Sequence, residues 1–130
     1  MSNRILVIDD EDAVRKSFVL ALEDLEYQVD TTESGERGIE MEKEGKYDLI
    51  FLDQKMPGLN GAETLQELRK IDNEVPIYII TAFYEEFFKD LKGTEKDGIE
   101  FDLLQKPFSI YQIALTVKSV LNGPLALKTE

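Results

Sequence analysis

The 130-residue sequence contains no cysteine, no histidine and no tryptophan. The absence of the first two excludes thiol nucleophiles, imidazole bases, disulfide bonds and Cys/His zinc sites. The sequence also lacks an apolar run near the ~18 residues that cross a bilayer, and a basic N-terminal segment followed by a long apolar stretch. We therefore expect a cytoplasmic protein without a membrane partner, whose chemistry uses carboxylates, hydroxyls, lysines or a bound cation.

Positive charge is scarce, because 15 Lys and Arg residues stand against 27 Asp and Glu residues, a net charge of -12. Such a surface repels nucleic acid, so direct nucleic-acid binding by this chain is not expected. The length suits one domain, and 42% hydrophobic content allows a sizeable core. We predict a domain over residues 1–121, with residues 122–130 as a tail or the start of a linker.

Short apolar runs alternate with segments whose apolar residues recur every three or four positions. This alternation predicts a parallel α/β fold with five strands, over residues 5–8, 27–32, 49–52, 76–80 and 101–104. Helices are expected between the strands and after the last one. The helix over residues 34–44 has few large apolar residues, but Ser34 is a suitable N-cap and the crossover needs a helix there. Asn60 is expected to cap the third helix, and residues 92–98 to end the fourth and lead into the fifth strand.

Polar residues follow four of the predicted strands: Asp9 and Asp10, then Asp53, then Thr81 and Ala82, then Lys106. In an open parallel sheet, ligands bind outside the carboxyl ends of the strands, where the strand order reverses. Three carboxylates meeting there repel each other unless they are protonated or hold a cation. Oxygen donors of this kind suit Mg²⁺. The sequence therefore predicts a magnesium site.

The acidic residues near the first helix also have structural interpretations. Asp9 and Asp10 would serve as helix caps, although we favour the metal site for this pair. Glu11 and Asp12, in the first turn, are interpreted as helix-dipole partners.

The other strand-end residues point to a function only when they are considered together. Asp53 alone reads as a turn residue, Thr81 as a strand-end hydroxyl, and Lys106 as a solvated lysine in a surface pair worth at most about 1 kcal/mol. A cation opposite a metal-bound carboxylate, however, is what phosphoryl transfer requires, and aspartate itself serves as a nucleophile. A cis Lys106-Pro107 bond would aim the amine over the pocket, and we expect it more strongly than the usual ~5% of X-Pro bonds.

A stripe of aromatic residues follows the fourth strand: Phe83, Tyr84, Phe87 and Phe88. We predict that it belongs mainly to the core, with part of it a candidate partner surface. Tyr84, which carries a hydroxyl, is the member expected to reach solvent.

These motifs resemble the receiver domain of bacterial two-component response regulators, including the chemotaxis regulators. The resemblance covers residues 4–121 and rests on Asp9-Asp10, Asp53-Gln-Lys-Met-Pro57-Gly-Leu-Asn-Gly61, Thr81-Ala82 and Lys106-Pro107-Phe108. It implies a doubly wound, flavodoxin-like α/β fold whose five-stranded parallel sheet has the order 2-1-3-4-5.

The resemblance also implies a metal site and a phosphoacceptor. Asp53 matches the residue that takes a phosphoryl group from a histidine kinase or a histidine phosphotransfer protein. Asp10 and Asp53 match side-chain ligands of Mg²⁺, Asp9 an acid acting through metal-bound water, and Lys55 a backbone-carbonyl ligand.

Three further matches concern the phosphoryl group. Thr81 and the Ala82 amide match groups that hold its oxygens, and Lys106 matches the lysine that pairs with them. The implied activity is catalysis of the chain's own phosphorylation and dephosphorylation, without turnover of an external substrate.

Phosphorylation adds about -1.5 to -2 charge at the strand ends, and Thr81 with its loop then moves inward. The resemblance implies that this changes the surface offered to a downstream effector or output domain, with a homodimer left open. Two features depart from the family. Leu103 stands where an aromatic residue usually couples to the switch, with Phe101 two residues earlier on the same strand face. The segment 81–106 is also a few residues longer than usual.

Three alternatives use similar residues or a similar fold. A haloacid-dehalogenase-type phosphatase would have a second Asp where Lys55 stands, and little chain is left for a substrate cap. A flavodoxin-like cofactor carrier would need a phosphate-cradling loop after the first strand, where the acidic run repels phosphate. A receiver-like docking module that is never phosphorylated would not need the intact set of Asp9, Asp10, Asp53 and Lys106.

Overall fold

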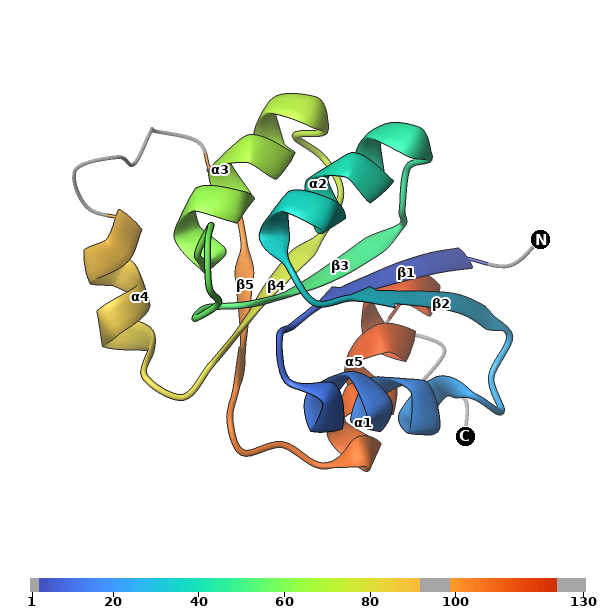
Figure 1. Ribbon diagram of the computed structural model, residues 1–130. Helices are drawn as coiled ribbons and strands as arrows, with labels where there is room; N and C mark the ends of the chain where they lie inside the picture. The colour runs from blue at the N-terminus through green and yellow to red at the C-terminus, as the bar shows by residue number, and fades with distance from the viewer. Residues whose placement is uncertain (1–2, 92–98, 124–130) are drawn as a thin grey trace.

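Five strands and five helices alternate along residues 3–91 and 99–123, the parts of the chain that the computed structural model describes (Figure 1). The strands are β1 (Asn3–Ile8), β2 (Tyr27–Thr32), β3 (Leu49–Asp53), β4 (Ile77–Thr81) and β5 (Asp102–Gln105). The helices are α1 (Asp12–Leu22), α2 (Gly35–Glu44), α3 (Gly61–Ile71), α4 (Tyr84–Leu91) and α5 (Ile110–Asn122). Each predicted strand is present within two residues of its expected bounds, and the predicted helix over residues 34–44 is confirmed as α2. The loop expected over residues 92–98 lies outside the described residues.

The strands form one parallel sheet in the order β2-β1-β3-β4-β5, as predicted. The central strands β1 and β3 are apolar on both faces because helices cover both sides of the sheet. Ile5 to Ile8 and Leu49 to Leu52 are all 0% exposed. A parallel sheet of this kind brings the carboxyl ends of its strands to one edge.

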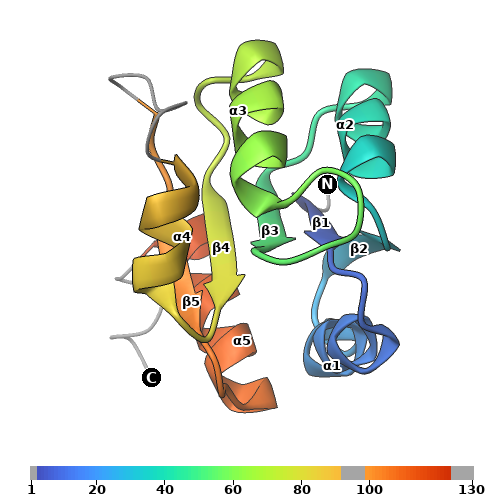
Figure 2. The ribbon, with the colours of Figure 1, turned by 60° about the vertical axis from the view of Figure 1, so that its left-hand side comes forward.

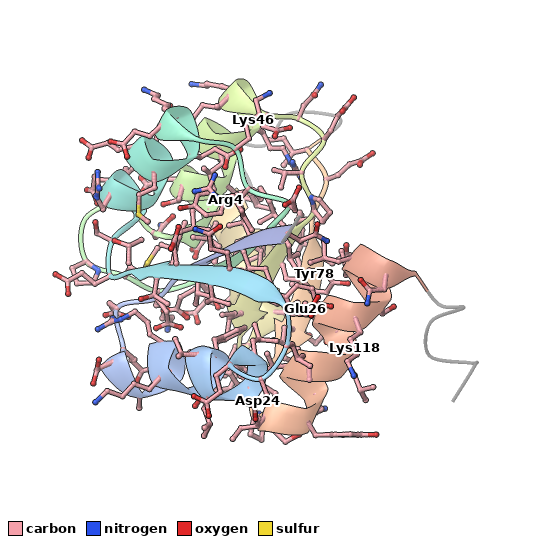
Figure 3. All side chains as sticks on the ribbon, turned by 90° about the vertical axis from the view of Figure 1, so that its right-hand side faces the viewer. Arg4, Asp24, Glu26, Lys46, Tyr78 and Lys118 are labelled. Carbon is pink, nitrogen blue, oxygen red and sulfur yellow. The ribbon has the colours of Figure 1, made fainter. Side chains whose placement is uncertain are left out.

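The helices divide between the two faces of the sheet, giving three layers (Figure 2). Helices α1 and α5 cover one face, where the core is built around Phe18, Phe51, Ile113 and Val117. Helices α2, α3 and α4 cover the other face, whose core includes Leu65, Leu68 and Phe87. Figure 3 shows Tyr78 on the α5 side of the sheet, in agreement with its contacts there. None of the helices in the described residues is both long and apolar enough to cross a membrane.

Polar side chains cap the N-termini of three of the helices. Ser34 Oγ accepts a hydrogen bond from the Arg37 N–H at the start of α2. Asn60 and Ser109 form capping boxes with the residues three positions later, at the starts of α3 and α5. These caps satisfy N–H groups that have no partner within the helix. The caps that the sequence suggested at Ser34 and Asn60 are both confirmed.

The prediction that the aromatic stripe belongs mainly to the core is wrong for Phe83 and Phe88. Phe87 is fully buried, but Phe83, Tyr84 and Phe88 are 68%, 43% and 48% exposed. Helix α4 has only eight residues and meets the sheet through one line of side chains, Phe87 and, four positions later, Leu91. Tyr84 does reach solvent, although Phe83 is more exposed.

Candidate functional site

The loops after β1, β3, β4 and β5 lie at one edge of the sheet (Figure 1). Residues of these loops line an open pocket of about 330 Å³. Parallel pairing brings them together, because Asp53 lies opposite Ile80 in the neighbouring strand and the Lys106 N–H donates to the Thr81 carbonyl at 2.8 Å. The lining residues are Asp10, Glu11, Asp53, Gln54, Lys55, Ile80, Thr81, Ala82, Phe83 and Lys106.

Three carboxylates converge at this edge of the sheet, and two of them, Asp10 and Asp53, line the pocket. Asp9, Asp10 and Asp53 each place an oxygen within 4.8 Å of the others. Asp9 and Asp53 are 0% and 5% exposed, whereas Asp10 is exposed. Asp9 Oδ1 accepts a hydrogen bond from the Glu11 N–H at 2.9 Å, but its Oδ2 is buried without a partner among the described residues. An acidic set with an orphaned buried oxygen fits a divalent cation with a preference for oxygen ligands.

The electrostatics of the cluster reflect its crowding. Burial raises the pKa of Asp53 to about 7, and the neighbouring charge of Asp9 adds to the rise while Lys106 opposes it. Burial likewise raises the pKa of Asp9 to about 6, against the lowering effect of the hydrogen bond from the Glu11 N–H. A bound cation would oppose both shifts, because a nearby positive charge favours the ionised carboxylates.

Lys106 supplies positive charge to the pocket from the end of β5. Its Nζ lies 3.6 Å from Asp53 Oδ1 and 3.4 Å from Glu11 Oε1, and its side chain is 29% exposed. Burial lowers the pKa of Lys106, but attraction to Asp53, Asp9 and Glu11 outweighs it, so the pKa is raised and the ammonium stays charged. The Lys106-Pro107 bond is cis.

The end of β4 adds a buried hydroxyl. Thr81 is 2% exposed, and its Oγ1 donates a hydrogen bond to Gln54 Oε1 and accepts one from the Phe83 N–H at 3.0 Å. Ala82, next along the chain, is exposed and lines the pocket. Thr81 and Ala82 thus lie at the carboxyl end of the fourth strand, at the pocket, as their positions in the sequence predicted.

Lys55 also lines the pocket, but its ammonium turns to another partner. Its Nζ lies 2.9 Å from Glu86 Oε1 on α4, with 66% of the Lys55 side chain exposed.

A close backbone contact holds the β3–α3 loop in place. The Gly61 N–H donates to the Gln54 carbonyl at 2.7 Å. A Cβ at position 61 would come within 2.6 Å of the Asp53 carbonyl oxygen and 2.8 Å of Gln54 Cα. Only glycine therefore lets the start of α3 pack this closely against the residue that ends β3.

Sequence reasoning missed two residues of the site. Glu11 was expected only as a helix-dipole partner, but its carboxylate pairs with Lys106 from the far end of the chain. Asp12 does lie in the first turn of α1, as expected, with Lys16 2.9 Å away. Gln54 was assigned no role, although it is 3% exposed and holds the Thr81 hydroxyl. The only signal for Gln54 in the sequence is its position directly after Asp53.

Comparisons with known proteins agree with this geometry. The family model of the response regulator receiver domain matches residues 5–118. The transcriptional regulatory protein ResD of Bacillus subtilis is 38% identical over 119 residues, which span 92% of this chain and 48% of that protein. YkoG, an uncharacterized transcriptional regulatory protein of the same organism, is 33% identical over 97% of this chain and 54% of that protein. The chain thus spans about half the length of these curated relatives.

A solved structure gives the same result for the fold. The response regulator TrrA of Thermotoga maritima, determined in complex with Mg²⁺-BeF, superimposes with a TM-score of 0.74 at 34% identity, covering 92% of this chain and 99% of that one. With the family model matching most of the chain, the sheet order as expected and four strand ends meeting in one acidic pocket, this chain belongs to the response regulator receiver domain family of two-component systems.

Proposed function

We propose that this receiver domain accepts a phosphoryl group on Asp53 in the presence of Mg²⁺ and thereby changes the surface it offers to a partner. The observation that carries the proposal is the convergence of a buried aspartate, two further carboxylates and one lysine ammonium in a single pocket. The donor would be a histidine kinase or a histidine phosphotransfer protein. In the transfer, the P–N bond to the donor imidazole breaks and a P–O bond to an Asp53 carboxylate oxygen forms.

The metal would be held by Asp9, Asp10 and Asp53, through a side-chain oxygen or a bound water, with the Lys55 carbonyl as the backbone ligand. Mg²⁺, when bound, neutralises negative charge on the carboxylates and on the incoming phosphoryl oxygens. The Asp53 carboxylate attacks only in its ionised form. A cation and the Lys106 ammonium both favour that form, against the burial that raises its pKa.

The remaining roles belong to residues at the ends of β4 and β5. Lys106, 3.6 Å from Asp53 Oδ1, is placed to pair with a phosphoryl oxygen on that carboxylate. The Thr81 hydroxyl and the Ala82 amide would bind the other oxygens as donors. The phosphoryl group on Asp53, at the end of β3, would therefore be bound by groups from the ends of β4 and β5.

The partner surface proposed here includes the exposed aromatic residues Phe83, Tyr84 and Phe88. Phe83 and Tyr84 lie two and three residues after Thr81, so a shift of Thr81 toward the phosphoryl group would move the start of α4. An effector protein or an output domain would read that change. Phe101 contacts this region, because its ring lies 5.2 Å from Phe87 and 5.9 Å from Phe88, between ring centroids.

The experiment is to measure the intact mass of the protein after incubation with acetyl phosphate, with and without Mg²⁺. The samples are the wild type, Asp53→Asn, and Asp24→Asn as a matched control on the exposed turn after α1 (Figure 3). We expect a Mg²⁺-dependent gain of one phosphoryl group in the wild type and in Asp24→Asn, and no gain in Asp53→Asn.

Each other outcome has a defined meaning. A gain that persists in Asp53→Asn would contradict the choice of acceptor. A folded wild type that gains no mass would next be given a phosphohistidine donor. If that also failed, the phosphorylation-independent docking module would become the leading function.

A further inference from the structure

Gln54 and Thr81, two buried polar side chains beside Asp53, are hydrogen-bonded to each other. Thr81 Oγ1 donates to Gln54 Oε1, and its oxygen already accepts from the Phe83 N–H at 3.0 Å. A hydroxyl has a single proton to donate. While this bond exists, the Thr81 hydroxyl has no donor available for a second acceptor in the pocket.

The backbone places these side chains together. The Gln54 N–H donates to the Ile80 carbonyl at 3.1 Å, which carries the β3–β4 pairing one residue beyond Asp53. Ile80 packs on the α1 and α5 face, so alternation along β4 turns Thr81 toward the opposite face. Thr81, Gln54 and Asp53 all line one pocket, so a phosphoryl group on Asp53 would enter the pocket that the Thr81 hydroxyl borders.

Packing alone does not account for a glutamine here. Gln54 is 3% exposed, and its Nε2 is buried without a hydrogen-bond partner among the described residues. An unused buried amide donor costs free energy, whereas an apolar side chain of similar volume carries no such cost. Within residues 3–91 and 99–123, the one polar contact of the Gln54 side chain is the bond to Thr81.

We propose that Gln54 is a positioning residue that holds the Thr81 hydroxyl away from the phosphoryl group, which must compete with Gln54 for the Thr81 proton. The proposal rests on the proposed function, phosphorylation of Asp53. Gln54 then weakens binding of a phosphoryl group by the equilibrium equivalent of one neutral hydrogen bond, roughly three- to tenfold. The Gln54–Thr81 bond therefore shifts the equilibrium of the domain away from its phosphorylated form.

The test measures the affinity of the Mg²⁺-loaded protein for beryllofluoride, which stands in for the phosphoryl group. Gln54→Met keeps the side-chain volume and removes the acceptor, and Gln54→Leu is a second variant should the first fold poorly. Gln28→Met, an exposed glutamine of the edge strand β2, is the matched control. We expect about three- to tenfold tighter beryllofluoride binding for the Gln54 variants and no change for Gln28→Met. The affinity for Mg²⁺ alone should be the same in all of them.

A double-mutant cycle separates this role from a structural one. The gain from Gln54→Met should disappear in a Thr81→Ala background and persist in a Thr81→Ser background, which keeps the hydroxyl. A gain of equal size with Thr81→Ala, or no gain in the otherwise wild-type protein, would overturn the proposal. A wild type that binds no beryllofluoride, or whose binding survives Asp53→Asn, would instead overturn the proposed function and this inference with it.

Discussion

The two ends of the sheet differ in how their charged groups are paired. The carboxyl end holds several carboxylates close together, whereas the arginines of the amino end have many partners. At the carboxyl end, Asp9, Asp10 and Asp53 gather with Lys106 as their cation, and the pKa values of Asp9 and Asp53 are raised. Arg4 lies at the amino end (Figure 3). Its guanidinium donates to the Lys46 carbonyl at 3.0 Å and lies 3.6 Å from Asp30 Oδ2 and 4.3 Å from the Tyr47 ring centroid.

Arg69, also at the amino end, likewise uses its guanidinium to bind several partners. It donates four hydrogen bonds, two to the Glu100 carbonyl and one each to the carbonyls of Asp72 and Val75. It thereby joins the end of α3 to the segments that lead into β4 and β5. The comparison teaches that one end of this sheet is built for stability, while the other keeps like charges together at a cost that a ligand can relieve.

The largest effect on stability is expected from Arg69→Ala. Removing this side chain leaves three backbone carbonyls without their donor and loses the packing of its stem, so we expect the free energy of unfolding to fall by about 3 kcal/mol. Urea denaturation measures it. Lys70→Ala is the control, because Lys70 is exposed and, within the described part of the chain, pairs with Glu67 on its own helix. A loss of similar size in both variants would contradict the stabilising role given to the amino end.

Asp53→Asn is expected to raise the free energy of unfolding of the metal-free protein. The pKa of Asp53 is about 7 when folded, against 3.8 for the free group, so stability falls as pH rises from about 4 to 7. Asparagine does not ionise, and it should stabilise the protein by about 2 kcal/mol at pH 8, after the loss of the Lys106 attraction is counted. The gain should vanish near pH 4.

The measurement is urea denaturation in EDTA across that pH range, with Asp24→Asn as the control that stays level with the wild type. A destabilised Asp53→Asn at pH 8 would show that the carboxyl end is not strained by its charges.

Mg²⁺ should bind more weakly as pH falls. A carboxyl must lose its proton before it binds the metal, and the pKa values of about 7 for Asp53 and about 6 for Asp9 place this loss between pH 5.5 and 7.5. We expect an affinity about tenfold lower at pH 6 than at pH 8. Calorimetry in buffers of different ionisation enthalpy would also detect the released protons. An affinity independent of pH over this range would argue against these carboxylates as the ligands.

The smallest effect concerns Glu42, the exception at the amino end. Burial raises its pKa to about 7, and the neighbouring Asp72 carboxylate adds to the rise, while the Tyr47 N–H, which donates to Glu42 Oε1 at 3.1 Å, opposes it. The folded state therefore holds the proton more tightly than the unfolded chain, and stability is lost as pH rises from about 4.5 to 7. Glu42→Gln should stabilise the protein by about 1 kcal/mol at pH 8 and have no effect near pH 4.5.

Thermal unfolding at the two pH values tests this prediction, with Glu23→Gln at an exposed position as the control. A stabilisation that is equal at both pH values would rule out ionisation of Glu42 as its cause.

Sequence reasoning was strongest where one local rule decides the outcome. Fully apolar runs such as residues 49–52 have no alternative to burial within a parallel sheet, so their strands were predicted to within two residues. The caps at Ser34 and Asn60 depend only on neighbours within one turn. It was weakest for α4, because the periodicity of an aromatic helix does not reveal how much of the helix other elements cover. Phe83 and Phe88 were therefore placed in the core but are exposed.

The same division applies to the site. The sequence by itself determined which strand ends carry Asp9, Asp10, Asp53, Thr81 and Lys106, and parallel topology then requires these residues to meet at one edge. Only the tertiary structure decided their partners. The Glu11–Lys106 pair joins residues 95 positions apart, and the Gln54–Thr81 bond joins residues 27 apart. Such contacts depend on the register of strands and on the room between packed side chains, which no local pattern in the sequence encodes.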